Sequence, residues 1–378
     1  MPNLTPYPLR FSGGLHMGTR GVNLEEAGIS IPSDTLFAAL LDALRRSGED
    51  VDAFAKAYLE DPPFLLTSAF PYVGNVRFYP IPANAAGLFD SKINARYGKR
   101  LARIRYMSEG LLKEALTNGK LNSWVFPETD NETPKTGVTL QGHSLWLKVD
   151  EIQNLPQEFQ RPESRCHALP RLTVWRTARV PRVTLDRITS ASNIFHAGKV
   201  EFAKECGLWF GVSWRNPDAE YNGQKFADVF EKALQMLKDD GLGGERTTGY
   251  GAFSYTPDQA ITLKDAQVGQ LAYLLSRYHP RVEEVDTSLK DGGSAYRLVS
   301  VAGWLRTFDG AAQRRKRVVL LEEGSLIRAT QGLMGDVVDV RPEYEDKTGE
   351  MKPGVPHPVY RYGLALALAW PAEGGSRA

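Results

Sequence analysis

A glycine-rich segment, GLGGERTTGYGAF at residues 241–253, constrains the fold of this chain more than any other stretch. It follows residues 226–237, whose apolar side chains recur at helical spacing, and it leads into residues 252–255, which alternate as a strand does. Exposed N–H groups in such a loop can bind an anion such as phosphate. In a dinucleotide-binding fold the loop would open a helix, and no Gly-Lys-Ser/Thr follows to make a P-loop. A ligand-facing loop and a plain helix-to-strand connection both remain open.

The composition is that of an ordinary globular protein with about two domains. The chain has 378 residues, of which 42% are hydrophobic and 24% charged. No apolar run approaches the length of a membrane span, and the first ten residues lack a signal-peptide layout. Cys166 and Cys206 form neither a disulfide framework nor a zinc motif. We therefore expect a cytoplasmic protein with no membrane contact, metal or cofactor.

Positive charge is segregated along the chain, although the net charge is only +1. Seven arginines lie within residues 161–190, six basic residues and no acid lie within residues 92–105, and a third cluster spans residues 314–317. Any one cluster is usually a solvated face. Three clusters in a nearly neutral chain indicate basic faces that can hold a polyanion, while other surfaces meet proteins.

The first 257 residues predict one α+β domain. A strand is expected at residues 7–11, and a helix begins at Ser33, with Ser33 as N-cap and Asp34 favouring the positive end of the helix dipole. Residues 60–160 predict irregular structure broken by prolines. A strand, helix and strand follow, which gives a ferredoxin-like (RRM-like) βαββαβ unit with large insertions.

Two further regions complete the predicted organisation. Residues 172–214 predict a long hairpin, the thumb, whose two strands flank a tip near residues 189–198. From residue 258 to residue 378 short strands alternate with glycine- and aspartate-rich turns, which predicts a second, β-rich domain of related type.

Groups that could catalyse a reaction are sparse. No HExxH or GxSxG motif is present, and no carboxylates have metal-ligand spacing. His16, beside a glycine-rich turn, could act as general acid or base in metal-free RNA cleavage. It could equally stack on or hydrogen-bond to RNA, or simply pack.

Four segments together resemble a known family. The glycine loop is similar to the C-terminal glycine loop of the RAMP superfamily of CRISPR proteins. Residues 33–37, SDTLF, resemble the first helix of one branch, the fourth subunit of the Csm (type III-A) interference complex. Residues 179–198 resemble the projecting thumb of type III RAMPs, and residues 357–368 resemble the end of the same subunit.

The resemblance implies a non-catalytic subunit that clasps the repeat-derived 5′ handle of crRNA. It implies docking on the large polymerase/cyclase-like subunit and beside a RAMP backbone subunit, with the thumb wedged into the guide–target RNA duplex. Loop N–H groups, one arginine, two hydroxyls and a stacking tyrosine suit RNA, as do thumb arginines and an apolar tip. The loop residues expected to bind RNA are Gly241, Gly243, Gly244, Arg246, Thr247, Thr248, Gly249, Tyr250 and Gly251. The N-terminal residues are His16, Ser33, Asp34 and Thr35. The thumb residues are Arg179, Arg182, Arg187, Asn193, Ile194 and Phe195.

Two other functions compete with this one. The first is a RAMP endoribonuclease that processes precursor crRNA with His16 and no metal. The second is an unrelated two-domain enzyme that holds a nucleotide on the glycine loop.

Overall fold

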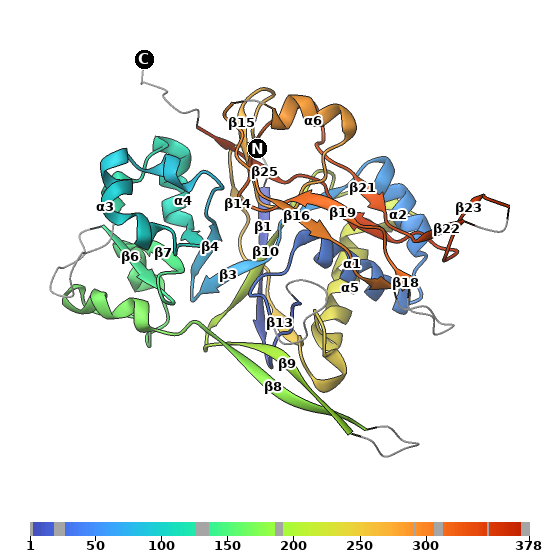
Figure 1. Ribbon diagram of the computed structural model, residues 1–378, viewed down its shortest axis with the longest axis horizontal. Helices are drawn as coiled ribbons and strands as arrows, with labels where there is room; N and C mark the ends of the chain where they lie inside the picture. The colour runs from blue at the N-terminus through green and yellow to red at the C-terminus, as the bar shows by residue number, and fades with distance from the viewer. Residues whose placement is uncertain are drawn as a thin grey trace.

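The computed structural model describes residues 3–18, 27–124, 136–185, 192–290, 292–305, 313–345 and 348–371 (Figure 1). Helices and a large mixed sheet occur together, so the fold is of the predicted α+β class. The α-helices are α1 (Ser33–Arg46), α2 (Val51–Glu60), α3 (Ser91–Leu101), α4 (Glu109–Asn118), α5 (Phe226–Asp240) and α6 (Val282–Leu289). The strands up to the glycine loop are β1 (Asn3–Phe11), β2 (Phe64–Leu66), β3 (Phe70–Val73), β4 (Val76–Pro80), β5 (Tyr106–Ser108), β6 (Gly137–Leu140), β7 (Leu145–Lys148), β8 (Trp175–Leu185), β9 (Ser192–Phe202), β10 (Cys206–Trp214), β11 (Glu220–Tyr221) and β12 (Gln224–Lys225). β13 (Phe253–Tyr255) follows the loop.

The large sheet has the order β13-β1-β10-β3-β4-β5-β7-β6. β1 lies between β13 and β10 and is antiparallel to both, with Leu9 opposite Tyr255 on one side and Leu208 on the other. β10 is antiparallel to β3, whereas β5 and β7 run parallel, which makes the sheet mixed.

Helices α1 and α5 pack against each other over β1 and β10, because each has one apolar stripe. The buried stripe of α5 consists of Phe226, Val229, Phe230, Ala233, Leu234 and Leu237, as its spacing predicts. Burying side chains of this size stabilises the fold by about 1.5–3 kcal/mol each. One detail of α1 is wrong in the prediction: Pro32 is the N-cap, and Ser33 is already the first helical residue. Proline's fixed backbone suits that boundary.

The thumb is shorter than predicted, because its second strand is not residues 199–214. β8 pairs with β9 along the whole length of both strands, from Trp175 opposite Phe202 to Leu185 opposite Ser192, and the hairpin projects from the body (Figure 1). A turn then intervenes, in which Glu205 has a φ of 58° and the Cys206 N–H donates to the Ala203 carbonyl at 3.1 Å. β10 beyond it is a central strand, buried from Cys206 to Ser213.

Residues 60–160 are ordered rather than irregular where the structure describes them. Strands of three to five residues, β2 to β7, extend the central sheet on its far side, and α3 and α4 lie beside them (Figure 1). Their shortness and the intervening prolines conceal the strand pattern in the sequence.

The C-terminal third is rich in strands but shares its cores with the rest of the molecule. Its strands are β14 (Ile261–Thr262), β15 (Leu271–Leu274), β16 (Leu298–Val301), β17 (Trp304–Leu305), β18 (Gln313–Arg314), β19 (Val318–Leu321), β20 (Leu326–Arg328), β21 (Val337–Asp339), β22 (Glu343–Glu345), β23 (Met351–Pro353), β24 (Tyr360–Tyr362) and β25 (Ala367–Trp370). In the described part they form the three-stranded sheet β20-β15-β25 and several two-stranded pairs, while β14 joins β1. Tyr273 packs in one cluster with Trp209, and Tyr362 packs in another with Phe37. A domain boundary at residue 257 therefore remains a prediction.

Candidate nucleic-acid interface

The glycine loop is fastened to the turn that follows β1. The Gly244 N–H donates to the His16 carbonyl at 2.9 Å, and the Gly251 N–H donates to the Gly14 carbonyl at 2.8 Å. Across the loop, the Leu242 N–H donates to the Gly251 carbonyl at 3.0 Å. The loop is thus held by main-chain hydrogen bonds to a neighbouring segment and to itself.

This docking explains much of the glycine content. Gly251 has a φ of 82°, and a Cβ there would lie 2.0 Å from the Leu242 carbonyl oxygen. Gly243 has a φ of 90°, and its Cβ would lie 2.4 Å from the His16 carbonyl oxygen. Only glycine combines left-handed backbone with such close approach. The interpretation as a structural connection therefore accounts for these two positions.

The expectation that all five loop glycines offer their N–H groups to phosphate is wrong. Gly241 donates to the Leu237 carbonyl and Gly249 to the Arg246 carbonyl, in addition to the bonds of Gly244 and Gly251. A backbone N–H that already donates cannot also serve an anion without breaking its bond.

The outward part of the loop is a short segment, residues 246–249, where a 3-10 turn (Arg246–Thr248) leads to Gly249. Arg246 has a side chain 38% exposed, 3.7 Å from the Asp42 carboxylate. The Thr248 hydroxyl donates to the Glu245 carbonyl at 2.8 Å, and Thr247 is exposed beside it. Arg246, Thr247 and Thr248 are therefore all exposed, although the Thr248 hydroxyl is already bonded within the protein.

Tyr250 does not offer the open stacking face expected of it. The residue is only 7% exposed. The Arg182 guanidinium lies 5.3 Å from its ring centre, and the Lys199 ammonium lies 5.6 Å from it. Both cations come from the thumb, so cation–π contacts with Tyr250 attach the thumb to the glycine loop.

The N-terminal candidates are mostly buried. His16 is 5% exposed, its Nδ1 lies 2.7 Å from the Gly198 carbonyl oxygen, and a Cβ on Gly244 would touch its ring. Ser33 and Asp34 are fully buried, while Thr35 is half-buried. The structure thus corrects the expectation that Ser33 and Asp34 meet RNA, because both are occupied inside the protein.

Asp34 links the N-terminal helix α1 to two arginines of the C-terminal third of the chain. Its carboxylate accepts from Arg361 at 2.8 Å and from Arg277 at 3.2 Å. The Ser33 hydroxyl accepts from the Arg277 backbone N–H at 3.0 Å. A buried charge requires such partners, so this group of residues has a structural role.

The thumb candidates fall into three groups. Arg182 connects the thumb to the glycine loop by donating to the Thr248 hydroxyl at 3.2 Å. Arg187, together with the true tip, lies outside the described residues, as does the side chain of Asn193. Arg179 lies on β8, opposite Gly198.

Ile194 and Phe195 were predicted to lie near the hairpin tip, but they lie within strand β9. Ile194 pairs with Val183 and is 66% exposed, and Phe195 pairs with Arg182. Because neighbouring residues of a strand point to opposite faces, these two side chains cannot enter one step of a duplex together.

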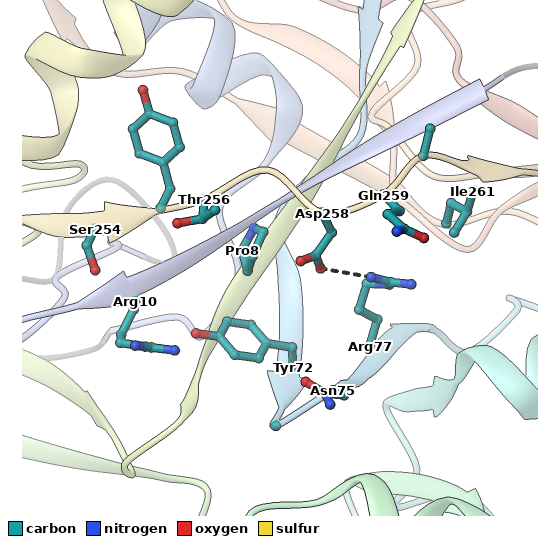
Figure 2. A pocket seen from close by; sticks show the side chains of 13 residues that line it. Pro8, Arg10, Tyr72, Asn75, Arg77, Ser254, Thr256, Asp258, Gln259 and Ile261 are labelled. Carbon is teal, nitrogen blue, oxygen red and sulfur yellow. Dashed lines mark hydrogen bonds and ion pairs between the residues drawn. The ribbon is translucent and has the colours of Figure 1, made fainter.

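A groove of about 580 Å³ beside β13 was missed by sequence reasoning. Figure 2 shows Arg10 and Tyr72 pointing toward each other in it, and Arg77 paired with Asp258 at 2.9 Å. Arg77 is also held by Glu109 at 3.0 Å, so its charge is neutralised and Arg10 is the exposed cation of this groove. The strand alternation of β1, with Leu9 buried and Arg10 exposed, is the signal that could have found it.

The described residues contain neither a cluster of candidate metal ligands nor a candidate membrane span. No group of three or more histidine, cysteine, aspartate or glutamate side chains could hold a metal ion there. No helix there is long and apolar enough to cross a membrane.

Comparison with known proteins gives consistent results. Residues 267–370 match the family model described as the CRISPR Csm4 C-terminal domain. The CRISPR system Cms protein Csm4 of Thermococcus onnurineus is 24% identical over 345 residues, which cover 89% of this chain and 90% of the relative. The protein of the same name from Mycobacterium tuberculosis is 24% identical over 362 residues, 94% of each chain.

Two solved structures share the fold. A Csm3–Csm4 subcomplex of a type III-A CRISPR–Cas interference complex contains a chain that matches with a TM-score of 0.63 at 15% identity, covering 97% of this chain and 100% of that one. A Csm1–Csm4 cassette in complex with pppApA matches with a TM-score of 0.54 at 18% identity, covering 99% and 100%. The match to the family model shows a Csm4 C-terminal domain over residues 267–370, and nearly the whole chain is similar to Csm4 proteins of CRISPR systems.

Proposed function

We propose that this chain is a non-catalytic RNA-holding subunit of a type III-A CRISPR effector complex, acting in antiviral defence in the cytoplasm. Its glycine-loop face holds the 5′ handle of crRNA, and its thumb lies against the guide–target duplex. Its protein partners are a backbone subunit of the Csm3 kind and a large subunit of the Csm1 kind, as in the solved complexes of its relatives.

The observation that carries this proposal is the junction between thumb and glycine loop. Arg182 of β8 contacts Thr248 and Tyr250, so the two elements that the sequence assigns separately to RNA meet in space. Arg246 and Thr247 lie exposed beside this junction. Cations and hydroxyls of this kind position a phosphate backbone without reading its bases.

The sheet supports the RAMP-type ferredoxin-like interpretation of residues 1–257. In chain order, β1, α1, β3, β10, α5 and β13 make a βαββαβ unit, with residues 74–205 inserted before the third strand. Its four strands have the spatial order β13-β1-β10-β3 and are antiparallel throughout. The same interpretation of residues 258–378 has less support, since the described strands there are divided among several small sheets.

The alternative of a His16 endoribonuclease is not favoured. A general acid or base must come within hydrogen-bond reach of the scissile group. His16 lies beneath the glycine loop and its Nδ1 is engaged by a carbonyl. We expect the purified protein to leave repeat RNA intact in EDTA, and cleavage lost in His16→Ala would reverse this choice.

The binding test uses a matched pair of arginines. Arg246→Gln removes a cation from the proposed face, and Arg215→Gln removes one at the other end of β10. Both side chains are 38% exposed and both lie near a carboxylate, that of Asp42 and that of Asp61 respectively. For handle RNA, we expect Arg246→Gln to weaken binding and reduce the salt-dependence slope by about 0.7, the value for one contact on a single strand. Equal affinities for the two variants would contradict the assignment. Bulky residues at Gly243 or Gly244 are unsuitable, because they would collide with His16.

The assembly test is copurification. The chain, expressed with Csm1-like and Csm3-like proteins from one source, should appear in a particle that contains crRNA. If a crRNA-containing particle forms but lacks this chain, the chain is not a subunit of the complex.

A further inference from the structure

Helix α3 bears a stripe of positive charge that the proposed handle-binding face does not use. Lys92, Arg96, Lys99 and Arg103 follow one another at spacings of four, three and four residues, which places them on one side of the helix and the turn after it. All four side chains are exposed. Residues 92–105 contain no acidic residue.

The opposite side of α3 is its attachment to the protein. Ile93 and Leu101 are partly buried against the second core cluster, which includes Phe89 and Trp146. None of the helix's own described side chains is fully buried. The stripe therefore faces away from the body, and the fold does not need its charge for packing.

Three of the four stripe residues also lack internal neutralisation. Within the described part of the chain, Lys92, Lys99 and Arg103 have no acidic side chain within ion-pair distance, in contrast to Lys113, which lies 2.7 Å from Glu109. Like charges on successive helical turns destabilise an isolated helix by about 0.2–0.5 kcal/mol per pair. Such a surface is suited to an external polyanion that relieves the repulsion.

The β6–β7 turn lies between α3 and the start of the thumb. His143 in this turn is partly buried and lies near Arg100 and Arg103, and burial followed by these two positive charges lowers its pKa. The Gly142 N–H donates to the Pro170 carbonyl at 2.7 Å. The Gln141 side chain accepts from the Val174 N–H at 2.6 Å, immediately before β8 begins.

The arrangement is visible in Figure 1, where α3, the strands β6 and β7, and the start of β8 follow one another down one side of the molecule. Hydrogen bonds thus fasten the β6–β7 turn to the residues just before the thumb, and the charges of the basic helix lie near its other side. A basic helix near a candidate interface that also carries cations suits the same kind of ligand.

We propose that α3 and the β6–β7 turn form a second RNA-binding surface, which holds the phosphate backbone of a single strand that runs on from the base of the thumb. The proposal rests on the proposed function in taking RNA as the ligand. Lysine and arginine side chains on an open helix, without an exposed aromatic platform, would bind phosphates and not read bases. This surface should therefore add affinity without sequence preference.

The experiment compares two triple variants of the full chain. Lys92→Gln/Lys99→Gln/Arg103→Gln removes the stripe, and Lys56→Gln/Lys264→Gln/Lys290→Gln removes three exposed lysines from other surfaces, so both variants have the same net charge. Binding is measured by fluorescence anisotropy with single-stranded RNAs, from the handle alone to the handle with increasing lengths of oligouridine, at several salt concentrations. Circular dichroism verifies folding of both variants.

The expected result depends on RNA length. For the handle alone the two variants should bind alike, and for the longest RNA the stripe variant should lose on the order of tenfold in affinity, with a salt slope lower by about 2 for three lost contacts. Equal RNA affinities of the two variants at every length overturn the inference. If the stripe variant then weakens assembly with an acidic protein partner, the stripe binds protein and not RNA. If Arg246→Gln reduces handle binding in the same assay, the proposed function survives that failure. If neither surface affects binding, both proposals fail.

Discussion

The glycine loop and the thumb are both assigned to RNA by the sequence, yet they are stabilised in opposite ways. The loop is fixed within the protein, with N–H groups donating to the turn after β1 and no room for a side chain at Gly251. The thumb is a two-stranded ribbon on which Val183 and Ile194 face each other at 56% and 66% exposure. Such a ribbon is marginal by itself. Folding thus explains most of the loop's composition, whereas it does not explain the exposed apolar residues of the thumb.

The largest difference we expect concerns the reactivity of a thiol on the thumb compared with that of a thiol in the buried strand β10. Cys206 opens β10, is 2% exposed, and has its pKa raised to about 12 by burial and by the nearby Glu158 and Glu205 carboxylates. In a Cys166→Ser background, iodoacetamide at about pH 8 should modify Ile194→Cys at least on the order of a thousandfold faster than Cys206. Similar rates would indicate that β10 is as exposed as the thumb, as the predicted hairpin over residues 172–214 requires. Because the pKa of Cys206 is raised above its unfolded value, the stability linked to this thiol is complete below about pH 9 and is lost as the pH rises toward 12.

Next in size is the cost of a methyl group inside the loop. Gly251→Ala forces Cβ against the Leu242 carbonyl and should reduce the free energy of unfolding by about 3–5 kcal/mol. Gly249→Ala is the control, because its φ of 84° is similar but nothing lies within 4 Å of its Cβ, so only the left-handed strain of about 1–2 kcal/mol applies. Urea unfolding measures both. Equal losses would show that backbone strain, and not the close approach of Leu242, requires glycine at residue 251.

The sequence was sufficient for elements whose pattern is local. The stripe of α5 from Phe226 to Leu237 and the strand β13 that follows the glycine loop have one period each, and both are where the periodicity predicts. It was insufficient at the thumb, where the run from residue 199 to residue 214 joins an exposed strand to a buried one with only a short turn between. Alternation alone does not reveal which sheet a strand joins.

Site residues that depend on distant partners were also beyond local reasoning. Asp34 suited a helix N-terminus by its position, but its partner Arg361 lies 327 residues away in the sequence. Tyr250 suited base stacking by its type, but Arg182 and Lys199 of the thumb cover its ring. Neither contact has a sequence pattern, since each depends on how the complete chain folds.

A smaller effect is expected at the junction between the two regions. Arg182→Gln removes the cation above Tyr250 and the bond to Thr248, which should cost about 1 kcal/mol of unfolding free energy. Amide hydrogen exchange in β8 and β9 should accelerate more than that in β10, because the thumb loses the contacts of Arg182 with the glycine loop. Arg176→Gln, an exposed arginine at the base of β8, is the control. If both variants exchange like the native protein, the junction does not anchor the thumb.

The smallest effect on stability is expected at the exposed pair of the thumb. Val183→Thr/Ile194→Thr keeps β-branched side chains, which suit a strand, but removes apolar surface that the described structure leaves open to solvent. The free energy of unfolding should change by less than about 0.5 kcal/mol, as is usual for surface positions. Affinity for a guide–target RNA duplex in the assembled complex should nevertheless fall if Ile194 inserts beside a base pair, since the inserted apolar contact offsets the cost of unstacking. Phe195→Thr is the matched comparison, because Phe195 lies on the other face of β9. A loss of stability above 1 kcal/mol in the double variant would mean that the pair packs within the protein, and duplex binding that is lost equally in Phe195→Thr would deny the Ile194 face any special role.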